Sequence, residues 1–201
     1  MNHQEGMTLE RFQHEYDGHP SWDTGKPQHY FVEALTQRTP QSPVLDIGCG
    51  TGVLSKFVAD LGCGVLGIDF APKAIEIASE KYADCLPDLA FKVHDAFALD
   101  ELGMTFGTIL DCCFFHTLDD PSREQYTQML HHVLAPGGRV YLLNLAVALP
   151  SPTAPRAITE ADITEHFDNG WTIVELGSTR VDITFAPDGV LGTFACIEKT
   201  P

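Results

Sequence analysis

The chain has 201 residues, of which 44% are hydrophobic and 20% are charged, and its formal net charge is −16 with neutral histidines. This composition predicts a folded domain with its own core, excludes a disordered chain, and argues against nucleic acid as a partner. The first five residues lack the features of a signal peptide, and no apolar run approaches the ~20 residues of a membrane span, so we expect a cytoplasmic protein without a membrane partner.

Residues 1–30 are polar and aromatic, with a weak helix expected near residues 8–16 and an irregular stretch at residues 19–28. After Pro43, short apolar runs alternate with helical periodicity, which is typical of βαβ units around a parallel sheet. The sequence predicts strands at residues 44–47, 65–68, 90–93, 108–113 and 140–145. It predicts helices at residues 53–61, 72–82 and 121–132. Asp120 is expected to cap the last of these helices.

The remaining chain is expected to add a loop and a hairpin. A proline-rich loop is predicted at residues 148–157, and a short helix begins at Thr159. Strand segments are predicted at residues 171–176, 181–185 and 190–198, with a hairpin turn at residues 187–189. We therefore predict an α/β fold, a Rossmann-like, doubly wound, seven-stranded and mostly parallel sheet with a C-terminal antiparallel hairpin and helices on both faces. Residues 31–201 would form one domain.

The cysteines and histidines give no sign of a metal site. Six cysteines include no C-x-x-C pair, and nine histidines show no ligand spacing, so we expect no bound metal and mostly reduced, packed thiols. Cys112 and Cys113 are adjacent in a predicted strand, where neighbouring side chains point to opposite faces.

A glycine-rich turn joins the first predicted strand to the first helix. Gly48, Gly50 and Gly52 alternate there, and a glycine lets a ligand approach the backbone where a Cβ would collide with it. The dinucleotide fingerprint G-x-G-x-x-G needs its third glycine at position 53, which is Val53, so the pattern of an NAD site is not met. Asp46 precedes the turn, and its carboxylate suits a positively charged ligand better than a pyrophosphate.

Two further acids follow predicted strands. Asp69 lies 21 positions after Gly48, where nucleotide-binding βαβ units place the acid that accepts hydrogen bonds from ribose hydroxyls. Its alternative role is only to cap the next helix. Asp95 would accept from an adenine amino group while Ala96 or Phe97 offers a backbone N–H to a ring nitrogen. Since ligands of open α/β sheets bind outside the carboxyl ends of the strands, these groups predict a nucleoside site.

In combination, these segments resemble the class I S-adenosylmethionine-dependent methyltransferases. Residues 44–52, VLDIGCGTG, resemble the first motif of that family, residues 67–69 the second, residues 94–96 the third, and residues 134–139 the turn before the fifth strand. The resemblance covers about residues 20–199. It implies S-adenosylmethionine as cofactor and S-adenosylhomocysteine as product. The sulfonium and ammonium groups of this cofactor favour a site rich in carboxylates.

The resemblance also implies roles for single residues. Asp46 would face the methionine amino group, Gly48 and Gly50 would border the methionyl moiety, Asp69 would hold the ribose and Asp95 the adenine. The predicted cofactor-binding set is Trp22, Gly25, Gln28, Asp46, Gly48, Cys49, Gly50, Asp69, Phe70, Asp95, Ala96, Phe97 and Cys112.

Residues 22–28, WDTGKPQ, resemble the P-W-D-x-G-x-P-Q segment of small-molecule methyltransferases similar to the thiol, halide and thiopurine enzymes. In that group the segment folds over the cofactor, which implies that Trp22, Gly25 and Gln28 cover the methionyl end and that residues 1–30 form a helix and lid. Such a lid would exclude water from a cationic methyl donor. The alternative is a tail that only docks Trp22 into the core.

Residues 111–120, DCCFFHTLDD, resemble the D-S-G-L-F-H-x-x-x-D segment of the same group. Phe115 and His116 would then lie where the methyl group is presented to the substrate. Either His116 is a general base, since imidazole titrates near neutrality, or it only shapes the pocket. Arg156 lies in the place of a W-G-P-R-R segment and would either meet an anionic substrate group or remain a solvated loop charge.

These observations predict a methyltransferase that moves a methyl group to a small-molecule nucleophile by in-line displacement. Alignment of the two reactants contributes up to ~7–11 kcal/mol to such a reaction. A thiol or selenol acceptor is favoured, and a hydroxyl or amine of a metabolite stays open. The alternatives are a non-catalytic S-adenosylmethionine-binding partner protein and an NAD-dependent oxidoreductase. The chain is expected to be a monomer or homodimer.

Overall fold

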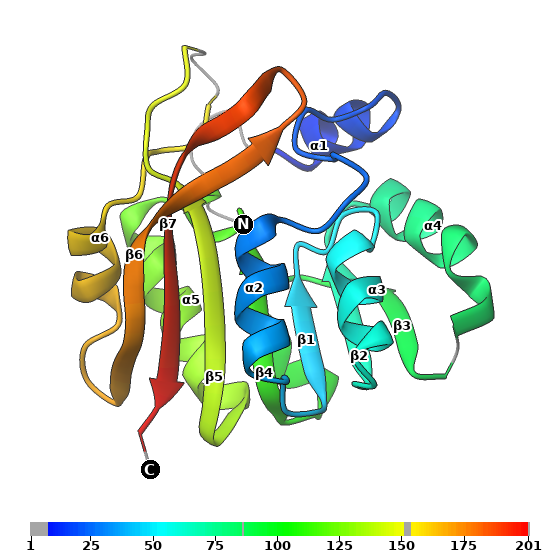
Figure 1. The fold of residues 1–201 in the computed structure, drawn as a ribbon. Coiled ribbons are helices and arrows are strands. Elements are labelled where there is room, and N and C mark those ends of the chain that lie inside the picture. Colours follow the sequence, from blue (N-terminus) through cyan, green and yellow to red (C-terminus); the bar gives the residue numbers. More distant parts are fainter. Residues whose placement is uncertain (1–7, 86, 151–153, 201) are drawn as a thin grey trace.

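The computed structural model describes residues 8–85, 87–150 and 154–200 (Figure 1). Its helices are α1 (Leu9–Tyr16), α2 (His29–Gln37), α3 (Val53–Asp60), α4 (Pro72–Lys81), α5 (Asp120–Val133) and α6 (Glu160–His166). Its strands are β1 (Val44–Ile47), β2 (Val65–Asp69), β3 (Leu89–Val93), β4 (Phe106–Cys112), β5 (Leu134–Leu145), β6 (Trp171–Ile183) and β7 (Ala186–Lys199). Within the described residues, no helix is long and apolar enough to cross a membrane.

All seven strands form one sheet in the order β3-β2-β1-β4-β5-β7-β6. Strands β1 to β5 pair in parallel, and β7 runs antiparallel to both of its neighbours. The predicted seven-stranded, doubly wound α/β fold is therefore confirmed. In such a sheet the carboxyl ends of the parallel strands meet at one edge, and α1 and the β6–β7 hairpin lie at that edge (Figure 1).

The core occupies both faces of the sheet. All four residues of β1 are buried, as expected for a central parallel strand covered on both sides. Leu45 and Ile47 pack with α5 and α6, whereas Val44 packs with α2 and α3, so alternate side chains of β1 serve opposite layers. Asp46 shares the face of Val44 and therefore points toward α3.

Three details differ from the sequence prediction. Helix α2 was not predicted, and it buries Tyr30, Phe31 and Leu35 against the sheet. Strand β5 begins at Leu134, inside the predicted turn region, since Leu134 pairs with Phe106 before the register shifts. The cap of α5 is Asp119 rather than Asp120, because the Asp119 carboxylate accepts the Ser122 backbone N–H at 2.9 Å.

The C-terminal hairpin is longer than predicted. The expected strands 171–176 and 181–185 are one continuous strand, β6, which bends at two register shifts. The hairpin turns at Thr184 and Phe185, and the predicted turn 187–189 lies within β7 as a bulge in which Gly189 has φ 66°. Of the predicted proline loop, residues 151–153 lie outside the described residues, as do residues 1–7 of the N-terminal segment.

Candidate active site

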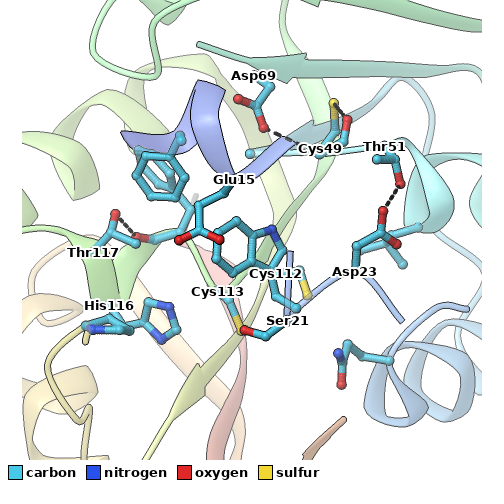
Figure 2. Close-up of a pocket in the computed structure, with 18 of the residues that line it drawn as sticks. Glu15, Ser21, Asp23, Cys49, Thr51, Asp69, Cys112, Cys113, His116 and Thr117 are labelled. Atoms are coloured by element: carbon cyan, nitrogen blue, oxygen red, sulfur yellow. Dashed lines mark hydrogen bonds between the residues drawn. The ribbon is translucent and has the colours of Figure 1, made fainter. Parts of the chain in front are cut away.

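A cavity of about 460 Å³ opens at the carboxyl edge of the sheet. This volume lies in the range of small-molecule pockets. Its walls come from the glycine turn after β1, the ends of β2 and β4, the loops after β3 and β5, the segment from α1 to Gln28, and the β6–β7 hairpin. In the close-up view, His116 lies away from Asp69 and Cys49, so the cavity has two distinct ends (Figure 2).

The glycine turn forms one end of the cavity. Gly48 and Gly50 have φ values of 65° and 54°, which glycine adopts without strain. A Cβ at Gly50 would lie 3.0 Å from the Tyr16 hydroxyl oxygen, so a side chain at this position would crowd Tyr16 on α1. The backbone N–H of Cys49 donates to the Ile68 carbonyl at 2.9 Å, which holds the turn against β2.

Asp46 is a buried carboxylate beside the glycine turn. The Ser55 hydroxyl on α3 donates to it at 2.5 Å, and its side chain is one of those that line the cavity. Burial is the main cause that raises the pKa of Asp46, to about 7. A cationic ligand would stabilise the ionised form of this buried carboxylate.

Asp69 ends β2 and joins two backbone segments. One carboxylate oxygen accepts the Gly50 N–H at 3.1 Å, and the other accepts the Ala71 N–H at 2.9 Å at the start of α4. Burial raises the pKa of Asp69 to about 6. The same side chain therefore fixes the glycine turn and lines the cavity, while the N-cap of α4 is Ala71 and not Asp69.

The loop after β3 brings Asp95 and Ala96 to the cavity but not Phe97. The Phe97 N–H donates to the Asp95 carboxylate at 2.9 Å, and the Phe97 ring packs against Tyr126 with centroids 6.2 Å apart. Because the Phe97 N–H already donates within the loop, Ala96 is the better placed of the two backbone donors predicted for adenine.

The N-terminal segment covers the cavity with aromatic rings. The Trp22 ring contacts Phe12 and Tyr16 edge to face, with centroids 5.8 Å and 6.2 Å apart, and Phe12 contacts Phe70 in the same way. Trp22 and Phe70 both line the cavity. Gly25, which was predicted to bind cofactor, lies outside this lining and takes φ 71° in an exposed turn.

Gln28 fastens this segment to the hairpin. Its side-chain amide donates to the Asp182 carbonyl at 2.9 Å, and its side-chain oxygen accepts the Asp182 N–H at 2.7 Å. The Thr184 N–H also donates to the Ser21 carbonyl at 2.9 Å. The segment and the hairpin are therefore joined as one cover over the cavity.

Asp111 organises the turn after β4. It is fully buried and accepts the backbone N–H groups of Phe114 and Phe115 at 2.9 Å and 3.1 Å and the Tyr126 hydroxyl at 2.8 Å. The turn also places Cys113 at φ 67°. As a result, Cys112 and Cys113 both line the cavity instead of facing opposite sides of a strand, and that prediction was wrong.

Sequence reasoning also placed the wrong phenylalanine at the substrate end. Phe115 is fully buried and packs against His166 and Phe167, with centroids 5.6 Å and 5.9 Å apart, while Phe114 lines the cavity. The two residues are adjacent, and the hydrogen bonds of Asp111 to this turn place Phe114, and not Phe115, in the cavity wall.

His116 lines the cavity and is 5% exposed. The Leu145 backbone N–H donates to its Nδ1 atom at 3.2 Å, so Nδ1 carries a lone pair and the proton of the neutral ring lies on Nε2. Burial, and then the nearby Arg123, lower the pKa of His116 to about 3. A neutral ring of this kind is a hydrogen-bond donor through Nε2.

Arg156 does not line the cavity. Its guanidinium pairs with Asp120 on α5 and with Asp162 on α6, so it holds the loop after β5 to these two helices. The geometry thus supports neither the substrate role nor the solvated charge considered from sequence. The hairpin residues Val181, Ile183 and Phe185, which do line the cavity, were missed because no local pattern indicates that the hairpin reaches the site.

The charge of the cavity wall suits a cationic ligand. Five carboxylates and two cationic side chains line it, namely Glu15, Asp23, Asp46, Asp69, Asp95, Arg11 and Lys26. Among the described residues, no group of three or more histidine, cysteine or acidic side chains is placed to hold a metal ion. The side-chain-free cradle at Gly48 and Gly50 and the acids at three strand ends fit a cofactor with ammonium, sulfonium and ribose groups.

Comparisons with known proteins agree with this geometry. Residues 44–138 match the family described as "Methyltransferase domain". A 2-heptyl-1-hydroxyquinolin-4(1H)-one methyltransferase from Mycobacteroides abscessus is 30% identical over 165 residues, which cover 81% of this chain and 73% of that protein.

Two solved structures share the fold. One, described as "Conversion of a Disulfide Bond into a Thioacetal Group during Echinomycin Biosynthesis", superposes with a TM-score of 0.84 at 26% identity and covers 96% of this chain and 93% of its own. The N-methyltransferase NodS from Bradyrhizobium japonicum WM9, in complex with S-adenosylhomocysteine, has a TM-score of 0.74 at 21% identity and covers 98% of both chains. The chain belongs to the class I S-adenosylmethionine-dependent methyltransferases.

Proposed function

We propose that this methyltransferase acts on a small, apolar ring compound through a sulfur or an acidic oxygen that is already ionised at neutral pH. S-adenosylmethionine, when bound, supplies the electrophilic methyl group. The residues of this chain bind the two reactants, exclude water and stabilise the negative charge of the acceptor. Asp46 and Asp69 would hold the ammonium and ribose groups of the cofactor, and Trp22 would cover its methionyl end.

The hydrogen bonding of His116 carries this proposal. A general base needs a free lone pair and a pKa near the working pH. In His116 the Nδ1 lone pair accepts the Leu145 N–H, and the pKa is lowered to about 3. The ring therefore offers an Nε2–H to an anion and takes no proton from the acceptor.

The neighbouring side chains support an apolar acceptor. Besides His116, the cavity wall includes Phe114, Leu145, Leu149 and Val181. The Cys112 thiol is protonated at neutral pH, since its contact with Cys113 and its burial raise its pKa. A thiolate or an acidic hydroxyl would need no base in these surroundings.

Similar proteins support both kinds of nucleophile. The name of the Mycobacteroides abscessus relative specifies a ring compound with a hydroxyl on nitrogen and a heptyl chain, and the description of the echinomycin protein concerns sulfur chemistry. The apolar wall and the Nε2–H of His116 suit either atom, so we retain both sulfur and acidic oxygen as the nucleophile.

The test is a pH profile of kcat/KM for two acceptors of similar shape and different acidity, such as an aromatic thiol and its phenol analogue. We expect the acidic limb of the profile to move with the pKa of the acceptor. With S-adenosylmethionine kept saturating at every pH, a limb that stays at one pH for both acceptors would show an enzyme base and contradict the proposal. Binding of S-adenosylhomocysteine without turnover of any acceptor would favour the non-catalytic alternative.

In the same assay, His116→Ala is expected to lower kcat/KM roughly tenfold, because one hydrogen bond to a charged group is lost. The shape of the pH profile should not change. Glu15 on α1 also lines the cavity, and its carboxylate lies 4.0 Å from the Arg11 guanidinium. Because a carboxylate in the cavity wall can also act as a base, Glu15→Gln is tested in parallel. Loss of the acidic limb in either variant would identify that residue as the base.

A second prediction concerns cofactor affinity and pH. The pKa values of Asp46 and Asp69 are raised to about 7 and about 6, so these acids bind protons in the free protein as the pH falls through this range. The ammonium group of the ligand favours the charged form of Asp46, and the ribose hydroxyls donate best to the charged form of Asp69, so binding must release those protons. Affinity for S-adenosylhomocysteine should therefore fall below pH 7, by up to about tenfold per pH unit for each acid that must lose a proton.

Isothermal titration calorimetry at pH 8, 7 and 6 measures this effect. The variant Asp46→Asn is the control, because it removes the group that titrates first and should flatten the dependence near pH 7. Equal affinities of the native protein at pH 8 and pH 6 would contradict the assignment of these carboxylates to the cofactor.

A further inference from the structure

The tip of the β6–β7 hairpin carries an unusually exposed aromatic side chain. Phe185 is 60% exposed, the highest value among the large hydrophobic residues exposed in the described chain, and yet it lines the cavity. A single exposed apolar side chain is common on protein surfaces, so the exposure of Phe185 counts only together with its place in the cavity wall. An apolar ligand in the cavity would remove part of this side chain from water.

Phe185 continues a stripe of apolar side chains along the hairpin. Val181 and Ile183 are two residues apart in β6, which directs them to the same side of the strand, Phe185 follows in the turn, and all three line the cavity. Val181 and Ile183 are buried, so the stripe leads from the interior to the mouth. From Val181 to Ile183 the strand rises ~7 Å, and the turn continues the apolar lining to Phe185, a path that a linear substituent of several carbon atoms can follow.

The loop after β5 also contributes apolar residues to the cavity wall. Leu149 and Pro150 on the loop after β5 line the cavity, as do Ala154 and Pro155 beyond the next gap in the described residues. Asp182, between the apolar residues of the stripe, forms an ion pair with Lys26 at 3.6 Å and holds Gln28 through its backbone. The hairpin is thus fastened in place and presents no polar side chain within the stripe.

We propose that Val181, Ile183 and Phe185 form a subsite for a linear apolar substituent of the methyl acceptor, with Phe185 as a specificity-determining residue at its outer end. This inference rests on the proposed function, because it places the reacting end of the acceptor beside His116. The heptyl chain in the name of the Mycobacteroides abscessus relative is a substituent of this chemical class.

The experiment measures binding, so that it does not depend on turnover. A series of ring compounds with one acidic group and alkyl chains of increasing length is titrated into the protein saturated with S-adenosylhomocysteine. Each added methylene is expected to tighten binding by about three- to fourfold until the stripe is covered. Affinity that is independent of chain length would overturn the inference.

Two hairpin variants separate the subsite from a general surface effect. Phe185→Ala should weaken binding progressively with chain length, reaching roughly tenfold for the longest compounds. Leu191→Ala is the matched control, since Leu191 lies on the same hairpin, is 42% exposed and does not line the cavity. Equal losses in both variants, or a change of oligomeric state in Phe185→Ala without a chain-length effect, would overturn the inference.

The same series distinguishes failure of this inference from failure of the proposed function. Methylation of short and long acceptors at equal kcat/KM, with equal affinities, would refute the subsite and leave the proposed function intact. Binding that tightens with chain length while none of the acidic groups is methylated would support the subsite and refute the proposed nucleophile.

Discussion

Asp69→Ala should weaken the binding of S-adenosylhomocysteine between tenfold and a hundredfold. The substitution removes the carboxylate predicted to accept hydrogen bonds from the ribose, and hydrogen bonds to charged groups contribute ~1.5–3 kcal/mol. It also removes the acceptor of the Gly50 and Ala71 N–H groups, so the glycine turn loses its support. Calorimetric titration of the folded variant gives the affinity directly.

Asp84→Ala controls for the change in net charge, because Asp84 is exposed and lies outside the cavity. Its affinity should match that of the unmodified protein. Unchanged affinity in Asp69→Ala would show that the ribose assignment is wrong, whatever the effect of the substitution on stability.

Asp111→Ala should lower the free energy of unfolding by roughly 2–4 kcal/mol. It leaves the Phe114 and Phe115 N–H groups and the Tyr126 hydroxyl without their acceptor in a buried turn. An unpaired buried donor costs ~1–3 kcal/mol, and release of the buried charge of Asp111, whose pKa burial raises to about 6, offsets part of this sum. Urea unfolding at pH 7 measures the difference.

The matched variant is Asp111→Asn. Its side-chain oxygen still accepts the two backbone N–H groups, and its amide donates to the Tyr126 oxygen, while the buried charge is removed. It should therefore be much more stable than Asp111→Ala. If the two variants unfold at the same urea concentration, hydrogen bonding by residue 111 is not what holds the turn.

The parallel strands and the part of the cavity at the glycine turn could be predicted because short stretches of sequence indicate them. The glycines at positions 48 and 50 and the acids Asp46 and Asp69 lie at the ends of short apolar strands, and all four line the cavity as expected. Strand length, turn chemistry and the order of βα units specify such positions without knowledge of distant contacts.

The acceptor end could not be predicted, because its geometry depends mostly on contacts between distant residues. The state of His116 is set by a backbone N–H from Leu145, 29 positions away in the chain. The placement of Phe114 and not Phe115 in the cavity wall has a local cause, the hydrogen bonds of Asp111, which the strand pattern does not indicate. The position of the hairpin turn at Thr184 and Phe185 depends on pairing between β6 and β7, which no single segment encodes.

The paired hydrogen bonds between Gln28 and Asp182 couple the two covers of the cavity mechanically. Trp22 on one side of this clasp and Phe185 on the other both line the same cavity. A displacement of either cover therefore has to carry the other with it or break these hydrogen bonds.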